Sequence, residues 1–229
     1  MTAVEQLVLE LAPPPEPTLD NFHAGSNAAV LSTLRAALGG VTWGGEPVLY
    51  LWGPAGCGKS HLLRAMAREA GAQHKLAAYL CAPHIDLPGD AQFLALDEVQ
   101  RLDAAGQIAV FDAYNRLRAT DSVLLAAGNL PPADLPLRED LRSRVGSGVV
   151  MQVRPLSEHE MRAVLDAHAL HRGVELAPGI LDYLLARFPR DLGSLVAAID
   201  ALDHYSLRTR RAITLPLLRE TIKLQANNP

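Results

Sequence analysis

Apolar and polar positions follow two different patterns along this chain of 229 residues. In the first part, short apolar runs of strand length are separated by stretches with helical periodicity. The runs predict strands at 47–52, 75–80, 92–96, 122–127 and 149–153, and the other stretches predict helices at 26–38, 59–70 and 103–119. Strands that alternate with helices are typical of a parallel sheet with crossover helices.

From Pro155 onward the strand-like runs stop and only helical patterns remain. Ser157 and Glu160 have the spacing of a capping box, which predicts a helix that ends at about His171. Further helices are expected at 177–187, 191–205 and 214–225. The fold class is therefore an α/β base with a parallel five-stranded sheet, followed by a small all-helical lid.

A third segment precedes the base. Residues 12–17 read Ala-Pro-Pro-Pro-Glu-Pro, a composition that favours an extended polyproline linker over a helix or a central strand. We therefore expect a separate peptide and its linker over 1–17, the α/β base over 18–154 and the helical lid over 155–229.

Composition narrows the class of protein. A hydrophobic content of 49% with a net charge of −4 is typical of a soluble globular chain. No apolar run approaches the roughly 18 residues of a membrane span, and the N-terminus lacks the pattern of a secretory signal. We expect a cytoplasmic protein with no membrane partner, in which Cys57 and Cys81 are free thiols.

The strongest chemical signal lies directly after the first predicted strand. Residues 53–60 fit the phosphate-binding pattern G-x-x-x-x-G-K-[ST] and read Gly53-Pro54-Ala55-Gly56-Cys57-Gly58-Lys59-Ser60. Backbone N–H groups of such a loop curl around phosphate oxygens, and the positive end of the following helix dipole points at the same place. Lys59 is expected to reach the β- and γ-phosphates, Ser60 to hold Mg²⁺, and His61 to complete the site.

An ordinary glycine-rich turn is the alternative for this octapeptide. The preceding apolar strand and the following helix are the context that confirms a phosphate loop, so they favour the binding site. The loop makes the same contacts with ADP and with ATP, and the resident nucleotide therefore stays open between the two.

Polar residues follow two other predicted strands. Asp97 ends an apolar run and is expected to bind Mg²⁺ through water, and Glu98 is expected to polarise an attacking water. Asn129 follows the strand at 122–127, where its amide would lie beside the γ-phosphate. The alternative for Asn129 is a turn residue before Pro131.

Two arginines are candidates for contacts with phosphate. Arg144 lies in a short polar helix before the last strand, and it is expected to face a neighbouring subunit's phosphates, whereas the nearby Arg142 is more simply a surface charge. Arg190 opens a lid helix and is expected to fold back onto the chain's own nucleotide. A salt bridge to Asp191 is the alternative for Arg190.

With these features in order, residues 18–225 resemble the AAA+ ATPase module, and within it the DnaA family, which contains the initiator DnaA and its regulatory homologue Hda. The segment 18–22 is similar to the one that touches the adenine in this family, which implies a nucleotide contact by Phe22. Residues 111–117, Phe-Asp-Ala-Tyr-Asn-Arg-Leu, look like the Hda version of the helix that follows the acidic strand.

The N-terminal peptide resembles a motif that binds the DNA polymerase III β sliding clamp. In an extended chain Leu7, Leu9 and Leu11 lie on one side, where pockets of a partner can take them, and Gln6 supplies polar bonds. The sequence departs from the motif at Glu10, where the family has a proline or another small residue. A frayed amphipathic tail is the alternative.

The resemblance implies a regulator that binds DnaA and the clamp, uses Arg144 to trigger hydrolysis of DnaA-bound ATP, and has weak or no turnover of its own. DnaA carries a DNA-binding domain after its lid, whereas this sequence ends at Pro229, so we expect no sequence-specific DNA binding. The alternatives are an independent ATPase or helicase loader, and a truncated DnaA paralogue that acts only as a tether. The oligomeric state stays open between a monomer and a homodimer.

Overall fold

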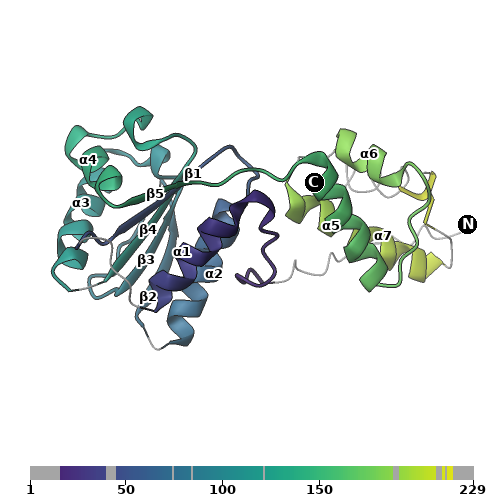
Figure 1. Ribbon diagram of the computed structural model, residues 1–229, viewed down its shortest axis with the longest axis horizontal. Helices are drawn as coiled ribbons and strands as arrows, with labels where there is room; N and C mark the ends of the chain where they lie inside the picture. Colours follow the sequence, from purple (N-terminus) through teal and green to yellow (C-terminus); the bar gives the residue numbers. More distant parts are fainter. Residues whose placement is uncertain are drawn as a thin grey trace, which may run out of the picture. The chain divides into compact units, whose positions relative to one another are not determined.

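The computed structural model describes residues 16–39, 45–73, 75–83, 85–120, 122–187, 191–209, 213–214 and 216–218. The chain divides into two compact units at Leu156 and Ser157 (Figure 1). The first unit, from Glu16, contains the sheet, and the described part of the second is helical. The division falls close to the expected junction of base and lid.

The first unit is built on a parallel five-stranded sheet with strand order β2-β3-β4-β1-β5. The strands are β1 (Val48–Trp52), β2 (Ala77–Cys81), β3 (Phe93–Asp97), β4 (Val123–Gly128) and β5 (Val149–Gln152). The three central strands are almost entirely buried, which explains why each reads as a continuous apolar run. The predicted fold class is confirmed, with strand ends shifted by at most two residues.

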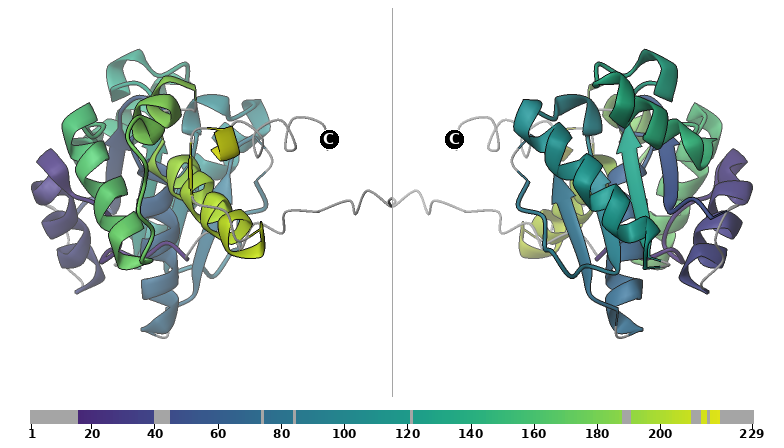
Figure 2. Two further views of the ribbon diagram at one scale, coloured as in Figure 1. Left: turned by 90° about the vertical axis from the view of Figure 1, so that its right-hand side faces the viewer. Right: turned by 90° about the vertical axis from the view of Figure 1, so that its left-hand side faces the viewer.

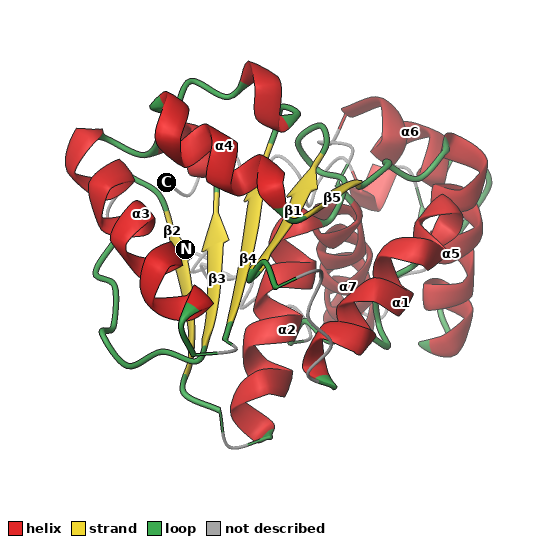
Figure 3. Ribbon diagram, turned by 60° about the vertical axis from the view of Figure 1, so that its left-hand side comes forward, coloured by secondary structure: helices red, strands yellow, loops and turns green. Residues whose placement is uncertain are grey.

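Helices cover both faces of the sheet (Figure 3). Alternate residues of β1 point to opposite faces: Leu49 packs in one core cluster with Leu62 of α2, whereas Tyr50 packs in the other with Tyr114 of α3. The first face is covered by α1 (Ala28–Leu38) and α2 (Lys59–Ala72), and the second by α3 (Ala104–Arg118) and α4 (Glu139–Ser147). The right-hand view of Figure 2 looks at the sheet from the side of α3 and α4.

The second unit contains α5 (Glu158–His171), α6 (Ile180–Arg187) and α7 (Leu192–Thr209). The predicted capping box is present, because the Ser157 hydroxyl accepts from the Glu160 N–H while the Glu160 carboxylate accepts from the Ser157 N–H at 2.7 Å. Helix α6 begins later than expected, after Gly179, whose φ of 85° is not helical. None of the described helices is long and apolar enough to cross a membrane.

The last predicted helix, 214–225, lies mostly outside the described residues, of which 216–218 are helical. The described lid helices bury a common set of apolar side chains: Leu165, Ile180, Leu184, Leu195 and Ile199. The all-helical lid is therefore confirmed over the residues that the structure describes.

Candidate nucleotide-binding site

The carboxyl ends of β3, β4 and β1 lie side by side, because these parallel strands are neighbours in the sheet. Asp97 ends β3, Asn129 follows β4, and Gly53 follows β1. Ligands of open α/β sheets bind outside this end of the strands. The fold therefore brings together three predicted features that are far apart in the sequence.

The phosphate loop, residues 53–60, connects β1 to α2. Gly56 and Gly58 have φ values of 77° and 96°, a left-handed conformation that favours glycine. At Gly53 a side chain is excluded by packing, because a Cβ atom would lie 2.2 Å from the carbonyl oxygen of Val153. The glycines of the motif thus stand where the backbone requires them.

The charge of the loop comes from Lys59, the first residue of α2. Its Nζ atom donates to the carbonyl oxygens of Gly53 and Pro54, both at 2.8 Å, and lies 3.6 Å from the Cys57 sulfur. This loop combines an ammonium group, a helix N-terminus and glycines in a left-handed conformation. Such a loop binds phosphate through its charge and its backbone N–H groups. These residues fit a nucleotide.

Asp97 is buried, with 2% of its surface exposed. Asp97 is two residues after Ala95 in β3, so the two side chains point to the same face of the sheet, and Ala95 packs in the cluster of α2. Ser60 is in the first turn of that helix. The carboxylate accepts from the Glu98 N–H at 2.9 Å and from the Tyr79 hydroxyl at 3.0 Å.

Ser60 and Asp97 supply the oxygen atoms that Mg²⁺ prefers. No group of three or more His, Cys, Asp or Glu side chains that could hold a metal occurs among the described residues. Mg²⁺ keeps several waters and is commonly held by one or two protein ligands together with substrate phosphates.

Glu98 is the one non-glycine residue of the described ranges with a positive φ, 54°. This left-handed conformation turns the chain out of β3 into a short 3-10 helix, Val99–Arg101. The Glu98 carboxylate pairs with Arg101 at 2.5 Å, and both side chains are well exposed. The pair was missed from the sequence, although the i,i+3 spacing of opposite charges was a visible signal.

Asn129 is exposed and follows the end of β4. The residues on either side of it, Gly128 and Leu130, are held by a buried tyrosine, Tyr50. The Tyr50 hydroxyl donates to the Leu130 carbonyl at 2.7 Å. A Cβ atom on Gly128 would lie 2.3 Å from that hydroxyl oxygen. Tyr50 was not recognised from the sequence, where it is one apolar position of a strand.

Phe22 and His61 lie next to the phosphate loop. The Phe22 ring packs on Gly58, where a Cβ atom would approach it to 2.6 Å, and its centroid lies 5.7 Å from that of His61. His61 Nε2 lies 2.9 Å from the Thr18 carbonyl oxygen, a contact that ties the segment 18–22 to α2. The structure thus brings together Phe22, which was expected to contact the nucleotide, and His61, which was expected to complete the phosphate-loop site.

Arg144 is half-buried in the last turn of α4. Its guanidinium carbon lies 5.2 Å from the ring centre of Tyr114 and 5.9 Å from that of Phe111, two residues of α3. Glu46, just before β1, accepts from the Tyr114 hydroxyl and from Ser147 at 3.1 Å. These hydrogen bonds, the first above all, lower the pKa of Glu46 against the opposing effect of burial.

These contacts place Arg144 at the amino end of the sheet. Glu46 precedes β1, and α4 ends directly before β5. A five-residue strand is about 16 Å long, and it separates this end of the sheet from the end that carries the phosphate loop. Arg142, on the same helix, is also half-buried.

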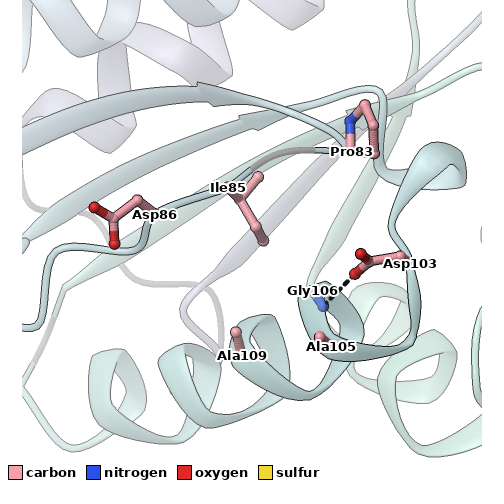
Figure 4. Close-up of a pocket in the computed structure, with 7 residues that line it drawn as sticks. All are labelled: Pro83, Ile85, Asp86, Asp103, Ala105, Gly106 and Ala109. Carbon is pink, nitrogen blue, oxygen red and sulfur yellow. Dashed lines mark hydrogen bonds between the residues drawn. The ribbon is translucent and has the colours of Figure 1, made fainter.

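A surface pocket of about 430 Å³ is lined by other residues, among them Pro83, Ile85 and Asp103 (Figure 4). The Asp103 carboxylate accepts from the Gly106 N–H at 2.7 Å and caps α3. None of the predicted site residues lines this pocket, and of its two carboxylates, Asp86 and Asp103, the second already caps a helix.

Known proteins resemble this chain in both units. Residues 158–222 match the family model of the Hda lid domain. An uncharacterized protein of Haemophilus influenzae is 29% identical over 232 residues, which cover 96% of this chain and 99% of that protein. Domain III of the Thermotoga maritima replication initiation protein DnaA has a TM-score of 0.73 at 20% identity, covering 95% of this chain and all of that domain.

A structure of the replication initiator DnaA bound to AMPPCP and single-stranded DNA has a TM-score of 0.68 at 22% identity, covering 86% of this chain and 68% of that one. The chain has the fold of DnaA domain III, a five-stranded parallel sheet followed by a helical lid, and its residues 158–222 match the Hda lid domain. Five of the predicted site residues lie outside the described ranges: Gln6, Leu7, Leu9, Leu11 and Arg190.

Proposed function

We propose that this chain is an AAA+ protein that switches off replication initiation by stimulating hydrolysis of the ATP bound to DnaA, while it holds ADP itself and is tethered to the β sliding clamp. The observation that carries the proposal is the position of Arg144 at the opposite end of the sheet from the phosphate loop. An arginine at that end of the sheet is remote from the phosphate loop of its own chain, and we assign it to a nucleotide held by a neighbour.

The chain's own nucleotide is assigned to the phosphate loop. Lys59 and the N-terminus of α2 would hold its phosphates, with Phe22 and His61 at the base and Arg190 closing from the lid. Ser60 and Asp97 would hold Mg²⁺, which neutralises charge on the phosphate oxygens when it is bound.

Arg144 is assigned a role in trans. A guanidinium supplied by a neighbour stabilises the charge that develops on a transferred phosphoryl group, and its contribution is on the order of 10³-fold or more. Tyr114 and Phe111 hold the flat group against α3, which limits the conformational entropy that it would lose on reaching a phosphate.

The tether is assigned to the N-terminal peptide on the strength of its sequence. Gln6 and three alternating leucines, Leu7, Leu9 and Leu11, would occupy pockets of the clamp. The proline-rich stretch 12–17 would separate this peptide from the base as a semi-rigid spacer. Tethering raises the local concentration of the regulator where DNA has been loaded with a clamp.

The test is hydrolysis of ATP preloaded on DnaA. We expect rapid conversion to ADP with the ADP-loaded chain and DNA-loaded clamp together, slow conversion when the clamp is omitted, and little ATP turnover by the chain alone. Fast turnover by the chain alone, unchanged when DnaA is added, would contradict the proposal and favour an independent ATPase. Association with DnaA without stimulation would instead indicate a tether.

A further inference from the structure

We propose that Tyr79 is a positioning residue that orients the Asp97 carboxylate for a divalent cation held with the nucleotide. The inference rests on the proposed function, because it requires that nucleotide and Mg²⁺ bind at this site. Tyr79 lies in β2, a strand that is not adjacent to the phosphate loop in the sequence, and the inference adds it to the residues of the site.

Strand pairing brings the two side chains together. Strand β2 lies beside β3, with Tyr79 opposite Ala95 and Cys81 opposite Asp97. Paired residues of parallel strands point to the same face, and so do residues two apart in one strand. Tyr79, Ala95 and Asp97 therefore share the face covered by α2, the helix that begins at the phosphate loop.

Two donors fix the carboxylate. The Glu98 N–H donates to Oδ1 of Asp97 at 2.9 Å, and the Tyr79 hydroxyl donates to Oδ2 at 3.0 Å. Each carboxylate oxygen accepts two hydrogen bonds, so both keep a lone pair for a metal-bound water. The Glu98 N–H belongs to the residue that follows Asp97, so it is close to the carboxylate in any case. The Tyr79 hydroxyl comes from another strand, and its hydrogen bond fixes the direction of Oδ2.

The tyrosine is itself held in place. The Arg64 guanidinium lies over its ring at 5.0 Å from the centre, and the ring packs against the core between sheet and α2. A tyrosine hydroxyl is protonated at neutral pH and is therefore a hydrogen-bond donor to the carboxylate.

A purely structural role is the competing explanation, because a buried carboxylate needs hydrogen-bond donors whether or not it holds a metal. The two explanations differ in what they predict for metal affinity. Partners of metal-binding side chains typically change metal affinity by about 10- to 100-fold when they are removed. Because Asp97 is expected to hold the cation through water, we expect the lower end, about tenfold.

The experiment compares Tyr79→Phe with Tyr50→Phe, which removes a buried hydroxyl from the same sheet that donates to Leu130 and not to Asp97. Mn²⁺ is titrated into each protein with saturating ADP and followed by electron paramagnetic resonance, and ADP affinity is measured separately in EDTA. We expect about tenfold weaker Mn²⁺ binding for Tyr79→Phe only, with metal-free ADP affinity unchanged in both variants.

Unchanged Mn²⁺ affinity in Tyr79→Phe, or an equal loss in Tyr50→Phe, would overturn the inference. Absence of ADP binding by the parent chain would instead overturn the proposed function, and with it the inference. Tyr79→Met serves as a second variant without the hydroxyl, and circular dichroism melts identify a variant that is unfolded. If both Tyr79 variants fold and bind Mn²⁺ like the parent, the hydrogen bond is structural only.

Discussion

Replacing Arg144 by alanine should affect catalysis far more than folding, and the structure allows both effects to be estimated. The guanidinium lies over two rings of α3, Tyr114 at 5.2 Å and Phe111 at 5.9 Å. A cation–π contact contributes about 0.5–1 kcal/mol when it is partly solvated, so the two together stabilise the fold by about 1–2 kcal/mol. The free energy of unfolding should fall by about this amount in Arg144→Ala.

The effect on stimulated hydrolysis should be larger. Loss of a trans arginine lowers the rate on the order of 10³-fold, which corresponds to about 4 kcal/mol of transition-state stabilisation. A domain with at least 5 kcal/mol of stability remains more than about 99% folded after losing 2 kcal/mol. Unfolding therefore cannot account for a thousandfold loss of rate.

The assay follows hydrolysis of ATP preloaded on DnaA in the presence of DNA-loaded clamp. Arg144→Ala should retain ADP binding, clamp binding and association with DnaA, because stabilisation confined to the transition state lowers turnover without lowering affinity. Arg144→Lys should rescue the rate poorly, since a point charge does not reproduce the planar guanidinium. Arg142→Ala is the matched control on the same helix, and its rate should stay near the parental value.

A near-parental rate for Arg144→Ala would refute the trans role. If the rate fell in Arg142→Ala instead, the contribution would belong to that residue. Loss of DnaA association together with the rate would show that Arg144 serves binding and not the transition state.

Three further predictions concern the loop, the tether and the sheet. Lys59→Ala should weaken ADP and ATP alike by roughly 2 kcal/mol, the scale of a lost charge-assisted contact, in fluorescence titrations; unchanged ADP affinity would exclude the phosphate-loop assignment. Gln6→Ala with Leu7→Ala should abolish clamp pull-down without changing ADP affinity, and retained clamp binding would place the contact elsewhere. Gly128→Ala should lower stability by about 1–3 kcal/mol in denaturant titrations, because its methyl group would lie 2.3 Å from a buried tyrosine hydroxyl, whereas Gly71→Ala, with open space around it, should not.

The sheet and the phosphate loop were predictable because each depends on residues close together in the sequence. A central parallel strand is buried on both faces, so its sequence is an unbroken apolar run, as in β1 and β3. The ends of such a run predict the ends of the strand to within two residues. The octapeptide 53–60 requires glycine where the backbone is left-handed or tightly packed, and those requirements are visible as a spacing. The start of α5 was visible in the Ser157 capping box for the same reason.

The supporting residues were not predictable, because they depend on which strand pairs with which. Tyr79 reaches Asp97 only because β2 lies beside β3 in one particular register, and a shift of one residue would turn its side chain to the other face. The contact of Arg144 with Tyr114 and Phe111 likewise depends on α3 and α4 packing together on one face. A sequence marks the groups that meet a ligand more clearly than the groups that hold them.

The position of Arg144 also limits how this chain can work with a neighbour. The phosphate loop follows the carboxyl end of β1, and Arg144 lies near its amino end, so the two groups serve opposite ends of one sheet. A neighbour that receives the arginine must present its own nucleotide to the amino end, which is a head-to-tail contact between different surfaces. In the proposed complex DnaA contributes its nucleotide and this chain its arginine. A second copy of the chain in that position would compete with DnaA for the same surface, so any self-association that covers Arg144 should reduce stimulation.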